Sequence, residues 1–365
     1  MAGRLAVLFC LCLPFAAAAQ ERSPSYLDLN PDDVFATVYE RLGIALPVKV
    51  ARDPQVWTTL DELKREACDQ KSIGDLATLL EKLGYRREAA ESQFNFVRAC
   101  GAPVIALHRS INILLKLSDH VKAVEVADEF VRRAPTNHDA HYLRGVALEG
   151  VGDYRRALID YANAIELFNT DKRKIGSSVF LRMANAYAKL GRFCEATTPV
   201  LNWIAIDPVA RDISRTQKII ADYENEGNCA VGKTVQSEKY ALRGQQHVVT
   251  VTAEINGVRG TFIIDTGASY VSVKSAFAER AKIPQSEASD ITLLTANGST
   301  KGSLTRADKV RLGKLEAQNV PVVVQKSDQK NFGGGVDGLL GMSFLSRFEL
   351  QVAGGFIEIR SRRRK

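Results

Sequence analysis

The segment Thr261-Phe-Ile-Ile-Asp-Thr-Gly-Ala-Ser269 decides the fold of the C-terminal part of this chain. Its apolar residues predict a buried strand that ends at Asp265, and Thr266 and Gly267 predict a tight turn directly after it. Gly267 lets another backbone come close, and the hydroxyls of Thr266 and Ser269 can hold the carboxylate in place. The tripeptide Asp-Thr-Gly is a weak signal by itself, because composition yields it in about one chain of this length in fifteen.

The sequence on both sides of this segment predicts a small, mostly β domain. Residues 247–255 alternate between apolar and polar, and Asn256-Gly257 is a hairpin turn signal before the returning strand 258–264. Further strands are expected at residues 291–296, 309–312, 320–325 and 356–360, and short helices at 275–282 and 342–348. The domain is therefore assigned to residues 247–360.

The preceding residues have a helical pattern with a repeat of 34 positions. Four units follow one another within residues 67–229, and small residues such as Gly145, Ala157 and Ala164 stand where two helices would touch. The pattern resembles the tetratricopeptide repeat, in which antiparallel helix pairs stack into a curved array, and residues 207–228 would form its capping helix. Residues 20–66 are expected to form an N-terminal helical segment. Residues 230–246 are polar and aperiodic and are interpreted as a linker.

Two further segments of the C-terminal domain fit the Asp-Thr-Gly loop in order and spacing. The first is the tip of a hairpin, made of Thr295, Ala296, Asn297, Gly298 and Ser299. The second, after Asp337-Gly338, holds two hydrophobic residues and a glycine: Leu339, Leu340 and Gly341. With Asp265, Thr266, Gly267, Ala268 and Ser269, these segments resemble the single-lobe, retropepsin-like aspartic proteases. The whole chain resembles bacterial exported proteins that join tetratricopeptide repeats to such a domain.

That resemblance implies an aspartic endopeptidase with Asp265 as its catalytic residue and the hairpin as its flap. Two carboxylates about 3 Å apart share one proton, so the ionised one activates water while the protonated one polarises the peptide carbonyl. The sequence has one Asp-Thr-Gly, and the domain has half the length that two lobes need. We therefore expect a homodimer with Asp265 of both copies at its two-fold axis, and no metal or organic cofactor.

Three other features are given structural interpretations. Asp337 is expected to be a turn or capping residue and not a second catalytic acid. The segment Gly227–Thr234 matches the letters of a phosphate-binding loop, but it lacks the preceding strand and the following helix that such a loop needs. His138 and His141 are three positions apart on a helix, and such a pair is more often a set of surface polar residues than a metal site.

Composition and the chain ends indicate an exported protein. Hydrophobic residues make up 45% and charged residues 25% of the 365 positions, which excludes a disordered or many-span membrane protein. Residues 1–19 have the pattern of a signal peptide, so the periplasm is the expected location, without an integral membrane span. The net charge of +7 is concentrated in the last positions, and residues 361–365 are interpreted as a solvated basic tail, with no support for nucleic-acid binding.

Four cysteines remain after such a leader is removed, and an oxidising compartment favours their pairing. Cys68 and Cys100 lie at ends of the first helix pair that meet, and Cys194 and Cys229 lie at the corresponding ends near the capping helix. We therefore predict the disulfides Cys68–Cys100 and Cys194–Cys229. Protein or peptide substrates are the expected ligands of the enzyme, and a partner protein is a possible ligand of the repeats. The alternative is a tetratricopeptide binding protein whose β domain folds but does not cleave.

Overall fold

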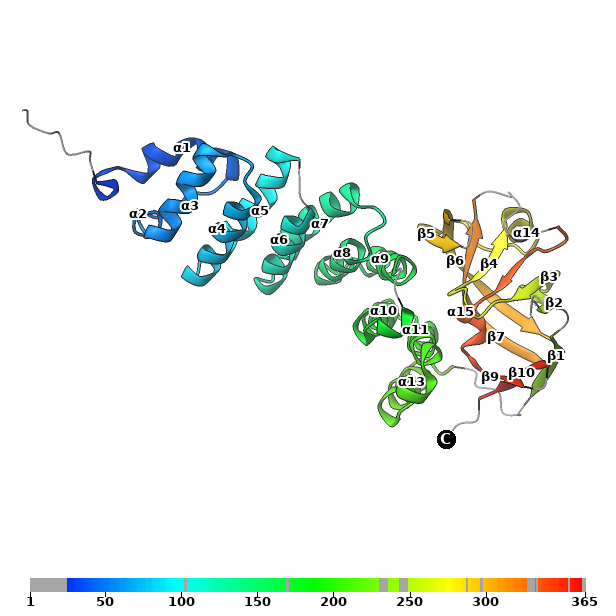
Figure 1. The fold of residues 1–365 in the computed structure, drawn as a ribbon. Coiled ribbons are helices and arrows are strands. Elements are labelled where there is room, and N and C mark those ends of the chain that lie inside the picture. Colours follow the sequence, from blue (N-terminus) through cyan, green and yellow to red (C-terminus); the bar gives the residue numbers. More distant parts are fainter. Residues whose placement is uncertain are drawn as a thin grey trace, which may run out of the picture.

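The computed structural model describes residues 25–101, 104–168, 171–229, 236–242, 249–286, 288–295, 298–326, 332, 334–353 and 355–362. The predicted signal peptide, the flap residues Ala296 and Asn297, and positions 363–365 of the basic tail lie outside this set. The helices form an elongated array, and the strands form a separate domain beside its C-terminal end (Figure 1). The chain thus has the two-part architecture that the sequence predicts.

Antiparallel helix pairs build the N-terminal array. Its helices are α1 (Pro31–Leu42), α2 (Val48–Ala51), α3 (Pro54–Arg65), α4 (Gln70–Leu83), α5 (Arg86–Cys100), α6 (Val104–Lys116), α7 (His120–Arg133), α8 (His138–Gly150), α9 (Tyr154–Glu166), α10 (Ser177–Lys189), α11 (Phe193–Ile206), α12 (Pro208–Arg211) and α13 (Ser214–Glu226). Asp119 and Asp153 cap α7 and α9 by accepting hydrogen bonds from backbone N–H groups of the first turn. Gly145 lets the paired helices approach closely, as expected, because a Cβ there would lie 2.7 Å from the Tyr161 ring of the paired helix.

Both predicted disulfides are formed in the structure. Cys68 joins Cys100, which closes the ends of α4 and α5, and Cys194 joins Cys229, which ties the start of α11 to the end of α13. His141 bonds to Asp160 at 3.0 Å and to the Pro135 carbonyl at 2.9 Å, so it has a structural role inside the array. Across the described ranges, no group of three metal-ligating side chains comes together, and no helix is long and apolar enough to cross a bilayer.

The β domain is a closed seven-stranded sheet with a small second sheet. Strands β2 (Val249–Ile255), β3 (Val258–Ile264), β4 (Val271–Lys274), β5 (Ser289–Thr295), β6 (Gly298–Leu312), β7 (Leu315–Gln325) and β8 (Gly338–Leu340) follow the order β2-β3-β8-β4-β7-β6-β5, and β2 also pairs with β6. Helix α14 (Ser275–Arg280) follows β4, and α15 (Met342–Leu345) follows β8. The second helix was expected to reach residue 348, but it ends earlier because Phe348 begins β9 (Phe348–Ala353).

The predicted linker 230–246 is wrong in its central part. Residues Ser237–Ala241 form strand β1, which pairs with β10 (Phe356–Ser361), and β10 pairs with β9. The polar composition of β1 fits an edge strand: Tyr240 packs on the domain core, and the Glu238 carboxylate accepts a hydrogen bond from the Lys314 amide at 2.8 Å. The basic tail also starts later than predicted, since Ser361 pairs with Phe348.

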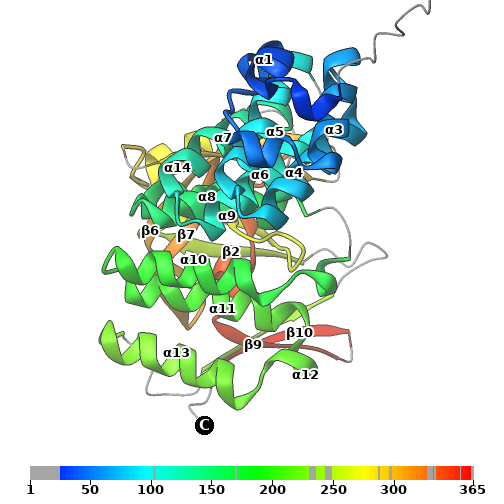
Figure 2. The ribbon, with the colours of Figure 1, turned by 90° about the vertical axis from the view of Figure 1, so that its left-hand side faces the viewer.

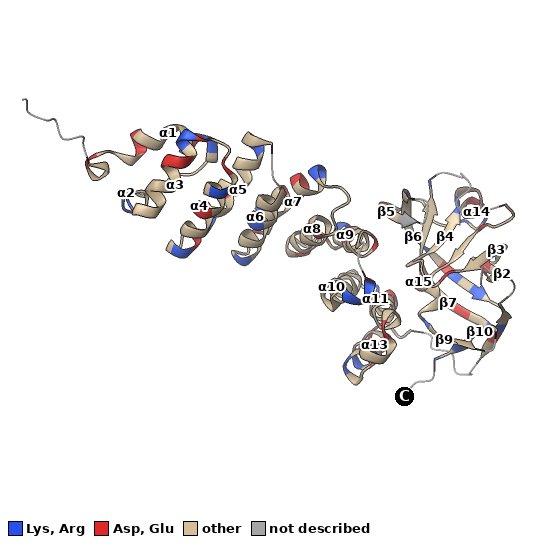
Figure 3. Cartoon of the chain, in the orientation of Figure 1, with Lys and Arg blue, Asp and Glu red and all other residues tan. Residues whose placement is uncertain are grey.

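The β domain lies against the last repeats. Helices α9 and α11 lie next to it, while α1 to α7 extend away (Figures 1 and 2). One hydrophobic cluster contains residues of α9, α10 and α11 together with Tyr270, Ile291, Leu293, Leu304 and Val323 of the β domain. Lysines, arginines and acidic residues are interspersed on the helices and the strands of the described part of the chain (Figure 3).

Candidate active site

The loop after β3 holds Asp265 in a defined turn. Asp265 donates its backbone N–H to the Leu340 carbonyl at 3.0 Å, and its carboxylate accepts a hydrogen bond from the Gly267 amide at 2.8 Å. A Cβ on Gly267 would lie 3.1 Å from the same carboxylate oxygen, so glycine keeps the approach to it open. Asp265 is half-buried, and Thr266 and Gly267 are exposed. A carboxylate at such a turn is oriented and remains accessible to a reactant.

The segment Leu339-Leu340-Gly341 lies beside this loop, as its motif predicts. β3 and β8 run parallel, with Ile263 opposite Leu339 and Ile264 opposite Leu340. Gly341 is required by space, because a Cβ there would lie 2.1 Å from the Tyr270 carbonyl oxygen and 2.7 Å from that of Ala268. The two amides that follow it, of Met342 and Ser343, donate to the carbonyls of Ala268 and Ser269 at 2.8 and 2.9 Å. The start of α15 therefore fixes the far half of the Asp-Thr-Gly-Ala-Ser loop.

The hairpin of the predicted flap is present. β5 and β6 are antiparallel, and Thr295 is opposite Gly298, so two residues connect the strands. Ser299 pairs with Leu294 one step along the hairpin. Gly298 has φ +105°, a conformation that glycine adopts without the steric cost of a Cβ.

Two supporting residues of the domain are explained by the structure. Asp337 accepts hydrogen bonds from the Thr261 amide at 2.9 Å and from Arg280 at 3.1 Å, so it ties the start of β8 to the middle of β3, away from Asp265. Its structural interpretation fits these contacts. Ser343, which the sequence analysis missed, is buried and bridges the Val271 amide and the Pro321 carbonyl. A short polar side chain inside an apolar segment is the one signal that marks it.

Helix α9 brings two more polar groups to the site. Asn163 accepts a hydrogen bond from the Thr292 amide of β5 at 2.8 Å, and the buried carboxyl of Glu166 lies beside Ser269, with its Oε1 atom unpaired among the described residues. Burial raises the pKa of Glu166, against the smaller opposing effects of Ser269 and Lys172. The sequence analysis missed both residues; the signal was the run from Tyr161 to Glu166, which has no exposed face.

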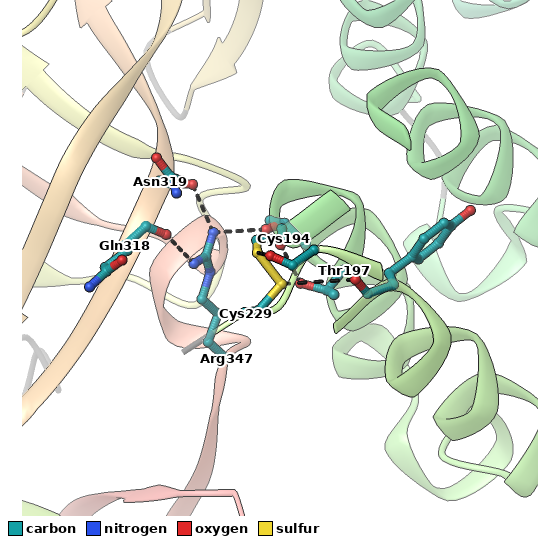
Figure 4. The surroundings of a disulfide bond; sticks show 9 residues. Cys194, Thr197, Cys229, Gln318, Asn319 and Arg347 are labelled. Carbon is teal, nitrogen blue, oxygen red and sulfur yellow. Dashed lines mark hydrogen bonds between the residues drawn. A yellow bond between two sulfur atoms is a disulfide. The ribbon is translucent and has the colours of Figure 1, made fainter. Parts of the chain in front are cut away.

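Arg347 makes the second anchor between the domains. Its guanidinium donates to Thr198 of α11 at 3.0 Å and to the carbonyls of Gln318 and Asn319 in the first half of β7, beside the Cys194–Cys229 disulfide (Figure 4). Burial lowers its pKa to about 10, which nearby Glu195 and Tyr187 partly oppose. A half-buried cation bonded to two carbonyls of one domain and a hydroxyl of the other links the two domains.

A cavity of about 670 Å³ lies between these two anchors. Thr266, Gly267 and Ser269 form part of one wall, and Met183 of α10 and Asn202 of α11 belong to the opposite wall. Part of the Asp-Thr-Gly-Ala-Ser loop therefore lines a cavity that it shares with the repeats.

Comparison with known proteins identifies the C-terminal domain. Residues 251–344 match the family described as aspartyl protease. The match contains Asp265, the hairpin and Leu339-Leu340-Gly341, so the three segments that the sequence singles out fall within it. No protein in a search of curated proteins matches the chain.

Solved structures resemble each part of the chain separately. A retropepsin-like aspartic protease from Rickettsia conorii is 26% identical, with a TM-score of 0.30, over 36% of this chain and 96% of its own. MamA from Desulfovibrio magneticus RS-1 is 15% identical, with a TM-score of 0.35, over 51% of this chain and 98% of its own. The tetratricopeptide repeat protein TTC0263 from Thermus thermophilus is 17% identical, with a TM-score of 0.32, over 55% and 98%. The chain is a helical repeat array followed by a domain of the aspartyl protease type.

Proposed function

We propose that this protein is an exported aspartic endopeptidase that hydrolyses peptide bonds with Asp265 of two copies. The observation that carries the proposal is the match of residues 251–344 to the aspartyl protease family, with Asp265 held at the end of β3. The two disulfides support export to an oxidising compartment such as the periplasm. Residues 1–19 are then the leader.

The chemistry needs two carboxyl groups that share one proton. The ionised carboxylate takes a proton from a bound water as the water oxygen attacks the scissile carbonyl carbon, and the protonated carboxyl donates to the carbonyl oxygen. The tetrahedral intermediate then collapses, the C–N bond breaks, and the leaving amine takes up a proton. Asp265 supplies one carboxyl group, and we propose that Asp265 of a second copy supplies the other.

The remaining active-site roles follow the same model. Thr266 and Gly267 shape the loop at the two-fold axis, Ala268 and Ser269 connect it to α15, and the β5–β6 hairpin covers the bound peptide. The repeats recruit the substrate or an adaptor protein, and α1 to α7 extend away from the β domain, where such a ligand can reach them (Figure 1).

A second function is favoured by one observation. Thr266 and Gly267 line a cavity together with residues of the repeats, which favours a binding protein whose protease-like domain does not cleave. The two functions are separated by comparing wild type and Asp265→Asn on casein and a peptide library, with and without a pepstatin-type inhibitor. Inhibitor-sensitive cleavage by wild type that the variant lacks supports the protease. Equal cleavage by both, resistant to the inhibitor, removes Asp265 from the mechanism.

A further inference from the structure

Asn163 and Glu166 form a polar pair on one helix that serves the β domain. They are three residues apart on α9, a spacing that places both on the same face. Asn163 is 5% exposed and Glu166 is 8% exposed, so both are buried polar groups. Burial of such groups is costly unless they are hydrogen-bonded. Asn163 has its partner across the domain boundary in Thr292, whereas Glu166 lies beside Ser269 and its Oε1 atom is unpaired in the described part of the chain.

These two contacts reach two parts of the candidate active site. Thr292 belongs to β5, the outer strand of the flap hairpin, and Ser269 ends the Asp-Thr-Gly-Ala-Ser loop. Ile291 and Leu293 of the same strand are buried in the hydrophobic cluster that they share with Ile165 of α9. One turn of a repeat helix therefore contacts both the flap and the catalytic loop.

The repeats also border the face that a second lobe has to reach. Thr266 and Gly267 face a cavity of about 670 Å³ whose other wall is formed by α10 and α11. A second Asp-Thr-Gly loop therefore has to approach a face that the repeats already border.

We infer that Asn163 and Glu166 form a clamp that holds the protease domain in a latent, single-copy state, which must release before two copies assemble the active site. The inference rests on the proposed homodimeric protease. It assigns a second role to the repeats: besides recruiting a substrate, α9 controls whether the catalytic face is available. Glu166 is a positioning residue in this model, since its carboxyl contacts Ser269.

The test uses the full chain with Asn163→Ala, because alanine favours the helix and removes the acceptor for Thr292. Asn112→Ala in α6 is the matched control, since its side chain bonds within its own helix to the His108 carbonyl. We expect Asn163→Ala to raise the dimerisation constant in sedimentation velocity about 2- to 10-fold, the effect of one lost hydrogen bond. Hydrogen exchange of β5 and the rate of casein cleavage should rise with it, and Asn112→Ala should match wild type.

The outcomes separate this inference from the proposed function. If Asn163→Ala dimerises like wild type while Asp265→Asn abolishes wild-type cleavage, the clamp is overturned and the protease stands. If Asn163→Ala dimerises more strongly but neither protein cleaves, the clamp stands and the protease is overturned. If Asn163→Ala cleaves more slowly without a change in association, α9 supports the active geometry and the clamp is overturned.

Discussion

Gly341→Ala tests whether close backbone contact under the catalytic loop requires glycine. The added methyl group would lie 2.1 Å from the Tyr270 carbonyl oxygen and 2.7 Å from that of Ala268. Neither oxygen can move freely, because the Met342 and Ser343 amides bond to the Ala268 and Ser269 carbonyls on the same loop. Overpacking costs about 1–3 kcal/mol, and each of the two strained hydrogen bonds adds about 0.5–1.5 kcal/mol. We expect a total loss of about 2–6 kcal/mol in the stability of the β domain.

Hydrogen exchange along a urea series measures this loss, because peptides from β3, β8 and α15 report on the β domain separately from the repeats. Gly334→Ala is the matched control, since a Cβ there would meet no atom within 4 Å. If Gly341→Ala destabilises these peptides by less than about 1 kcal/mol, or no more than the control does, the packing argument for the motif is wrong.

Three further outcomes are expected. Asp337→Ala leaves the Thr261 amide and Arg280 without their acceptor, and should lower the stability of the β domain by about 1–3 kcal/mol. The exposed control Asp308→Ala should not lower it, and loss of cleavage per folded molecule of Asp337→Ala would contradict the structural role of Asp337. Replacing Cys194 and Cys229 by alanine opens a link of 35 residues in sequence separation and should cost about 2–4 kcal/mol in α11–α13, read by hydrogen exchange. Burial raises the pKa of Glu166 above its ordinary value of 4.5, so the docked chain binds a proton that the released chain loses, and docking should weaken as pH rises above that value. Glu166→Gln should flatten this pH dependence, measured as the hydrogen-exchange rates of residues 265–270. The control Asp160→Asn changes a residue of the same helix that bonds to Arg144, and it should leave the pH dependence unchanged. Equal slopes of exchange rate against pH for wild type and Glu166→Gln would refute the role of Glu166.

Local signals explain what could be predicted. Asp265, Gly267 and Gly341 stand at turns whose residue types are dictated by backbone geometry, and Asn256-Gly257 fixes a hairpin without long-range information. The two disulfides could be predicted because, in an antiparallel helix pair, the start of one helix lies beside the end of the next. Assigning the repeats therefore places the cysteines in pairs.

The missed elements have physical reasons as well. β8 has three residues and β4 has four, too short for a period of two to be recognised, and both are buried by neighbouring strands. β1 is polar because one edge of it is unpaired, so its composition resembles a linker. The clamp of Asn163 and Glu166 was beyond the sequence, because an amphipathic pattern shows that a face is covered and does not show what covers it.

The strength of the clamp can be bounded by comparing two ligands of the same face of the β domain, namely the repeats of its own chain and a second copy of the protein. The β domain is tethered to the repeats through the residues between Glu226 and Ser237, and a tethered domain acts at an effective concentration of about 1 mM. A second copy at about 1 µM is a thousandfold less concentrated, so it must bind about 4 kcal/mol more tightly than α9 to displace the repeats. Removing one hydrogen bond with a net contribution of about 1 kcal/mol weakens the contact of the repeats by only part of that difference. Asn163→Ala should therefore lower the concentration needed for dimerisation without making the dimer dominant at micromolar chain, and full activation needs a ligand that binds the released state.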